Sequence, residues 1–209
     1  MITIKINAED MAKVKKALAE IPGAADRVCM RAINDGLAGM KTDASAEIRS
    51  EIVLKKSAVD ATFKTVKASV TSLLGVFSST GKPVPLIEYG ARQTAKGVSV
   101  HVKQANPRSV IPGTFIAVVR SKQQMDQGIE GHKGVFWRVW HERQRKPFNR
   151  NFPYGKLPKK YRLPISQRYG PRVPDILSNE PVMAAVLKKA DDRMHTNIDR
   201  QINYELSKL

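Results

Sequence analysis

The 209-residue chain lacks several features that define common protein classes. Its single cysteine, Cys29, excludes a disulfide within the chain. Cys29 lies in an apolar helical pattern, which favours a buried small side chain over a reactive thiol. No segment approaches the ~20 consecutive apolar residues of a membrane-spanning helix. The first ten residues, MITIKINAED, lack the basic and apolar regions of a signal peptide. We therefore expect a protein that is made and kept in a cytosol-like compartment.

Patterns typical of catalytic or metal sites are also scarce. The four histidines have no second His or Cys at metal-ligand spacing; they are His101, His132, His141 and His195. No glycine-rich loop ends in the Lys-Ser/Thr pair that cradles phosphates, and no nucleophile elbow occurs. The sequence predicts no catalytic residue, no metal site, no cofactor and no enzymatic activity. The alternative, a nuclease or lytic enzyme, requires acids or histidines gathered in one cleft.

Positive charge dominates the composition. The chain has 36 Lys and Arg against 19 Asp and Glu, which gives a net charge of +17. Residues 131–172 hold twelve of the basic residues and one acid, so this segment contributes +11 of that charge. A solvated surface would spread its charge, whereas a local surplus favours polyanionic partners.

The period of the apolar residues changes along the chain. Segregated helical and strand patterns are typical of an α+β fold. The sequence predicts a small, mostly antiparallel sheet flanked by a long N-terminal helical region and a C-terminal helix, with a long basic loop or arm. The expected parts of this single domain are a mainly helical region at 1–62, the sheet at 63–141, the extended basic arm at 142–177 and the C-terminal helix at 178–209.

The basic arm interleaves cations with aromatic residues. The candidates for facing DNA or a neighbouring subunit are Arg138, Arg143, Arg145, Lys146, Arg150, Lys156, Lys159, Lys160, Arg162, Arg168 and Arg172. The candidate interface anchors are Trp140, Phe148, Phe152, Tyr154, Tyr161 and Tyr169. Such a segment can bind along the surface of a neighbouring subunit, because Tyr, Trp and Arg are favoured contact residues. It can also bind phosphates without sequence preference, or be a solvated loop with a few packed aromatics.

Four blocks give the chain a family resemblance. They are PLIEYGARQTAKGVSVHV at 85–102, IPGTFIA at 111–117, GHKGVFWR at 131–138 and LPISQRYGPRVPDIL at 163–177. In this order, between a helical N-terminus and a C-terminal helix, they resemble the minor tail protein Z family of long-tailed bacteriophages and prophages, also called tail completion proteins. No block is a catalytic signature.

The resemblance implies a structural virion protein. Such a protein acts late in assembly, at the head-proximal end or neck of the tail, and makes the tail competent to join a filled head. The implied partners are further copies of the chain in a ring, expected to be a hexamer, together with tail terminator or tail tube proteins, head-tail connector proteins and packaged DNA, but no membrane. The implied locations are the virion and, during assembly, the host cytoplasm. The alternative function is a sequence-nonspecific nucleic-acid-binding module.

The block at 163–177 ends the basic arm. Its three prolines, Pro164, Pro171 and Pro174, should hold the chain extended, and Gly170 should relieve a turn. Its apolar residues are Ile165, Val173, Ile176 and Leu177. We expect the block to dock against the sheet or an adjacent subunit and so position the basic arm.

Overall fold

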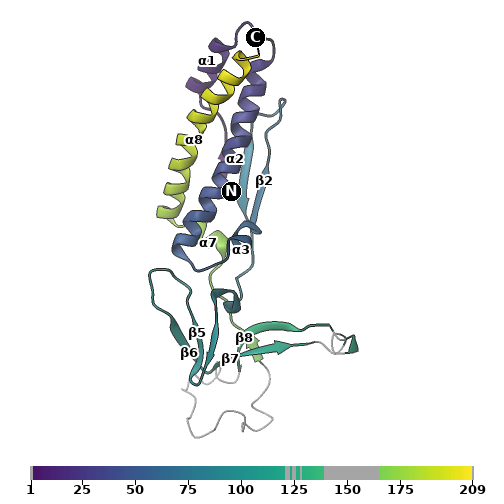
Figure 1. The fold of residues 1–209 in the computed structure, drawn as a ribbon, viewed down its shortest axis with the longest axis vertical. Coiled ribbons are helices and arrows are strands. Elements are labelled where there is room, and N and C mark those ends of the chain that lie inside the picture. The colour runs from purple at the N-terminus through teal and green to yellow at the C-terminus, as the bar shows by residue number, and fades with distance from the viewer. Residues whose placement is uncertain (1, 121–122, 124–125, 128, 139–164, 209) are drawn as a thin grey trace. The chain divides into compact units, whose positions relative to one another are not determined.

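The structure is a computed structural model that describes residues 2–120, 123, 126–127, 129–138 and 165–208 (Figure 1). Its elements form an α+β fold with a helix-rich N-terminus and a long C-terminal helix, as predicted. The predicted single domain divides into two compact units, because the described strands after residue 82 pair only with one another. The helical unit comprises Met1–Ser50, Lys56–Gly81 and Val173–Leu209, and the basic unit comprises Glu51–Lys55 and Lys82–Arg172.

The strands within the described residues form three separate sheets rather than one. In chain order the elements are β1 (Ile2–Ile4), α1 (Ala8–Ala17), α2 (Ala24–Glu51), α3 (Lys56–Asp60), β2 (Phe63–Val66), β3 (Gly75–Ser79), the 3-10 helix η1 (Leu86–Tyr89), β4 (Arg92–Thr94), β5 (Gly97–Val100), β6 (Ser109–Pro112), β7 (Thr114–Val119), β8 (His132–Arg138), β9 (Ile165–Gln167), α7 (Val173–Leu177) and α8 (Glu180–Leu206). The sheet orders are β1-β3-β2, β4-β5-β6 and β7-β8-β9, and all pairs are antiparallel.

Helix α2 forms the centre of the helical unit, between the sheet and α8 (Figure 1). A Cβ atom on Gly75 of β3 would lie 2.7 Å from Cγ2 of Ile33, so the missing side chain lets α2 approach the strand. A Cβ atom on Gly36 of α2 would lie 3.2 Å from Cε of Met194 on α8. These close approaches bury α2 on two faces, as interior packing requires.

Cys29 lies in this core. Its side chain is fully buried, and its Sγ is 3.8 Å from Sδ of Met11. Burial is the main cause that raises the pKa of the Cys29 thiol to about 11, so little thiolate exists at neutral pH. The prediction of a buried small side chain is confirmed.

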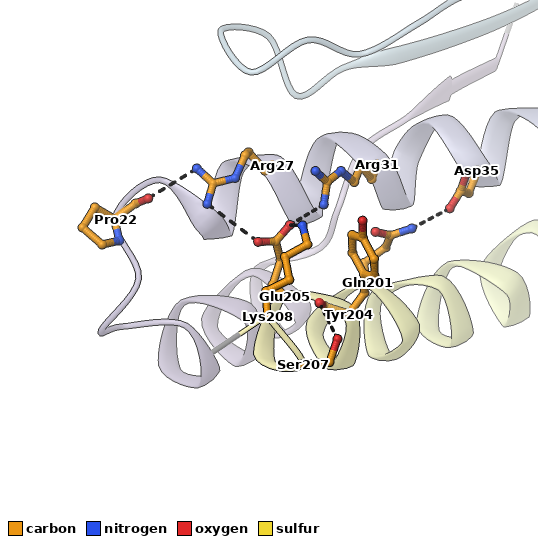
Figure 2. Close-up of polar contacts among 9 residues, drawn as sticks. All are labelled: Pro22, Arg27, Arg31, Asp35, Gln201, Tyr204, Glu205, Ser207 and Lys208. Carbon is orange, nitrogen blue, oxygen red and sulfur yellow. Dashed lines mark hydrogen bonds and ion pairs between the residues drawn. The ribbon is translucent and has the colours of Figure 1, made fainter.

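Ion pairs join α2 to α8 along their length. Near the C-terminus, the buried carboxylate of Glu205 accepts a hydrogen bond from Arg31 (Figure 2). Its second oxygen lies 3.7 Å from Nη2 of Arg27, and Nζ of Lys208 lies 3.2 Å from the first. The hydrogen bonds from Arg31 and then Lys208 lower the pKa of Glu205.

Helix α8 buries one apolar face in the helical unit. Val182, Val186, Ile198 and Ile202 are buried, whereas Leu206 is 42% exposed because it ends the helix. No helix within the described residues is both long and apolar enough to cross a membrane.

The predicted extended arm at 142–177 is wrong at its C-terminal end. Residues 165–167 form β9, which pairs with β8 and so confirms that the block docks against a sheet. Residues 173–177 form α7, because Val173, Ile176 and Leu177 are buried in the core of the helical unit. Pro174 lies in the first turn of this helix, where proline is tolerated, instead of holding the chain extended.

Gly170 is required for a close contact in the basic unit rather than for a turn. A Cβ atom there would lie 2.6 Å from Cε2 of Tyr89, a ring that is fully buried. The backbone N–H of Gly170 donates to the carbonyl of Val84 at 2.7 Å, and the Tyr89 hydroxyl donates to the carbonyl of Pro171 at 3.2 Å. A backbone hydrogen bond and contacts of the Tyr89 side chain thus hold the block beside η1.

We expect Glu205→Gln to destabilise the protein near pH 7, because the Arg31 guanidinium loses its anionic partner. Since the pKa of Glu205 is lowered in the fold, its contribution exists above the normal carboxyl pKa and disappears as the pH falls through the lowered value. Urea unfolding at several pH values should therefore show a difference from wild type that shrinks in acid. Glu20→Gln, at an exposed position, is the control. A difference that is independent of pH would contradict the assignment.

We expect Gly170→Ala to lower the free energy of unfolding by roughly 1–3 kcal/mol, because the added methyl overlaps the Tyr89 ring. Chemical denaturation measures this change. Gly81→Ala is the control, since its methyl first meets a flexible Thr62 methyl at 3.3 Å. Equal stability of Gly170→Ala and wild type would show that the block is not packed on Tyr89.

Candidate polyanion-binding surface

The two units differ sharply in charge. The basic unit contains 20 Lys and Arg against five Asp and Glu, a net charge of +15. The helical unit contains 16 against 14, a net charge of +2. Acids of the helical unit contact its own cations, as in the pairs Arg193–Asp43 and Arg200–Asp35. A surplus of the size found in the basic unit repels itself and attracts polyanions.

Arg168 is a predicted site residue whose side chain stacks on an aromatic ring. Its guanidinium carbon lies 4.1 Å from the centroid of the Trp137 ring. Its backbone is held on both sides: the N–H donates to the carbonyl of Val135 at 2.8 Å, and its carbonyl accepts from the N–H of Leu86 at 3.1 Å. Stacking on a neutral ring orients a guanidinium without cancelling its charge. Arg168 is therefore positioned to bind an anion.

Arg108 is a second oriented guanidinium of the basic unit. Its Nη2 donates to the carbonyl oxygens of Gly90 at 2.6 Å and Ser99 at 3.0 Å. Its Nε donates to the Ser99 hydroxyl at 3.3 Å. Gly90 has a φ of 62°, which turns the chain after η1 and directs its carbonyl to Arg108. These neutral oxygens fix the side chain and leave its positive charge in place.

Arg138, at the end of β8, lies over an aromatic pair. Its guanidinium carbon is 5.0 Å from the centroid of Phe115. Phe115 and Phe136 are cross-strand partners on β7 and β8, with ring centroids 6.4 Å apart. Aromatic rings thus support cations at two places on the β7-β8-β9 sheet.

Hydrogen bonds link the side chains of Tyr169, Gln167 and His132 beside β9. The Tyr169 hydroxyl donates to Oε1 of Gln167 at 3.1 Å. Nε2 of Gln167 lies 2.7 Å from Nε2 of His132, so the amide must donate and the imidazole nitrogen must accept. The contact ties β9 to the first residue of β8.

The structure places four of the predicted site residues. Arg138, Arg168 and Tyr169 lie on or beside β8 and β9, and Arg172 is exposed at the end of the basic unit. Tyr169 is half exposed, and its role as an interface anchor stays a prediction. The other predicted residues lie outside the described residues; they are Arg143, Arg145, Lys146, Arg150, Lys156, Lys159, Lys160 and Arg162, with Trp140, Phe148, Phe152, Tyr154 and Tyr161.

Sequence reasoning missed two residues of this surface. Arg108 lies outside the charge cluster, and only its contacts with Gly90 and Ser99 reveal its fixed position. Trp137 is a strand residue whose partner, Arg168, is distant in sequence. No local pattern predicts either contact, and the charge cluster at 131–172 identifies Arg168 only as a candidate cation.

Side chains of the kinds that bind metal ions do not cluster in the part of the chain that the structure describes. There, no group of three or more His, Cys, Asp and Glu side chains could hold a metal ion.

Comparisons with known proteins returned no relative. No family model, curated protein or solved structure matches the chain.

We expect Arg168→Gln to weaken binding of a short fluorescein-labelled DNA duplex several-fold at low salt, because a fixed phosphate-binding group is lost. The slope of log affinity against log salt should fall by about one. Fluorescence anisotropy at several NaCl concentrations measures both quantities. Lys16→Gln removes the same charge from an exposed position of the helical unit and should change binding much less. Equal effects of the two substitutions would mean that only net charge matters.

Proposed function

We propose that the chain is a structural virion protein that completes the head-proximal end of a phage tail. It acts without catalysing a reaction, as an oligomeric ring that makes the tail competent for head-tail joining. The observation that supports this proposal is the division of charge: one nearly neutral, well-packed unit and one unit with a net charge of +15. The sequence resemblance to tail completion proteins supplies the specific role.

A ring around a DNA passage needs two different surfaces on each subunit. Neighbouring copies must touch without strong repulsion, and a nearly neutral unit permits this. The passage must attract a polyanion or an acidic protein, and oriented guanidinium groups such as those of Arg108 and Arg168 suit that role. The charge division of this chain provides both properties in one subunit.

The resembling block at 163–177 supports the same proposal through its described part. Its β9 extends the sheet that carries Arg138 and Arg168, and its α7 packs in the helical unit. One short segment therefore contributes to both units. In the proposed particle this segment anchors the C-terminal end of the basic arm.

The proposal extends to partners and place. The ring, a hexamer, lies between tail tube or tail terminator proteins and the head-tail connector, with packaged DNA passing through it. The protein is present in the host cytoplasm during assembly and then in the neck of the virion.

A sequence-nonspecific nucleic-acid-binding module is the second candidate, because the surplus charge of the basic unit also suits free duplex DNA. This function predicts tight binding by the isolated protein, with affinity that falls steeply as salt rises. It predicts no requirement for the protein in head-tail joining.

The test is made in a phage or inducible prophage that encodes the chain. We expect a nonsense mutation in its gene to yield filled heads and separate tails, visible by negative-stain electron microscopy. Adding the purified protein to this lysate should restore joined particles and infectivity. An unrelated basic protein of similar net charge, added as a control, should restore neither. Joined, infectious particles formed without the chain would overturn the proposal and favour the nucleic-acid-binding module.

A further inference from the structure

Strand β2 and the β2–β3 connection expose apolar side chains on the helical unit. We call this surface the tip; it comprises Lys64, Val66, Lys67, Val70 and Leu74, all exposed. Val66 is 62% exposed, Val70 50% and Leu74 44%. Three large apolar side chains exposed between Val66 and Leu74 favour a contact surface over a solvated hairpin.

The tip is held rigidly. Asn34 of α2 donates from Nδ2 to the carbonyl of Ala68 at 3.1 Å and accepts from the Ala68 N–H at 2.9 Å. The N–H groups of Ser69 and Ser72 each donate to the carbonyl of the other, at 2.9 and 3.1 Å. These contacts hold the backbone of the connection, which lowers the entropy lost when a partner binds.

A complementary surface lies on α8 of the same unit. Glu180, Ala184, Leu187 and Asp191 recur at helical spacing, so they share one face, and all are exposed. We call this face the stripe. Leu187 is 45% exposed, and the side chain of Asp191 is 76% exposed. The stripe combines an apolar centre with two acids, of which Asp191 has its Oδ2 4.0 Å from Nε2 of His195. The tip combines an apolar centre with two lysines.

The tip and the stripe cannot meet within one helical unit. Figure 1 shows β2 and α8 on the two sides of α2. Two different complementary surfaces on separate sides of one subunit make a head-to-tail contact, which closes into a ring when the rotation between copies permits. The unit that carries both surfaces has a net charge of only +2, so copies meet there with little repulsion.

We propose that the tip of one copy docks on the α8 stripe of the next copy, with Val70 against Leu187 and Lys67 near Asp191. This inference rests on the proposed function, since it names the contact that builds the proposed ring. The partner surface is thus a second copy of this chain rather than a different protein.

The first test uses two variants that each spoil one surface. Val70→Asp disrupts the tip, and Leu187→Asp disrupts the stripe; both positions are exposed, so the fold should persist, as circular dichroism checks. Each variant alone should associate at least tenfold more weakly than wild type in sedimentation velocity. Mixed together they should form a one-to-one dimer but no ring, because one intact tip meets one intact stripe. If the wild-type protein assembles only on tails, the measurement for the same samples is the number of copies bound per tail.

Leu206→Asp is the matched control. Leu206 is similarly exposed on α8 and lies roughly 28 Å along the helix from Leu187. This variant should assemble like wild type. Charge exchange gives a second test: Lys67→Glu and Asp191→Lys should each weaken association, and the double variant should recover it.

The possible outcomes separate the two proposals. A wild-type ring that Val70→Asp and Leu187→Asp leave intact overturns the tip-to-stripe contact alone. A mixture of the two variants that forms no dimer does the same. A wild-type chain that stays monomeric in solution and on tails overturns both the contact and the ring.

Discussion

Close packing of α2 against two neighbours is the constraint on which the helical unit depends. Gly75 lets the helix approach β3, and Gly36 lets it approach α8. Larger side chains at these positions would separate the layers and expose the apolar residues between them. Ion pairs also join α2 to α8, but each exposed pair contributes little to the free energy of unfolding. The buried carboxylate of Glu205 differs from them, because several cations surround it at the end of the helix pair.

Charge separation is the second constraint, and it links the fold to the proposed function. The helical unit balances its acids and cations internally, so it can form a stable core and touch other copies. The basic unit holds Arg108 and Arg168 through carbonyl oxygens and an aromatic ring, which orient these side chains without supplying negative charge. A polyanionic or acidic partner would relieve the resulting repulsion. A subunit divided in this way suits a ring through which DNA passes.

Sequence reasoning succeeded where a local rule was sufficient. Asn7 caps α1 as an N-cap residue should, with its Oδ1 accepting from the Asp10 N–H at 2.7 Å. The helical period predicted the helical regions that hold α2 and α8, and the change of period after residue 62 predicted strands. It failed where distant contacts decide the structure. The pattern at 163–177 suggests an extended arm, yet burial of Val173, Ile176 and Leu177 favours a short helix. Gly170 suggests a turn, yet it makes room for the Tyr89 ring.

The sequence by itself determined the α+β class, the positions of the long helices and the concentration of positive charge, because periodicity and composition are local properties. Only the tertiary structure decided that the strands form three sheets in two units, and that the charge belongs almost wholly to one of them. It alone paired Trp137 with Arg168 and placed Arg108 against Gly90 and Ser99. Contacts between residues far apart in the chain depend on how the elements pack, and no local pattern encodes that packing.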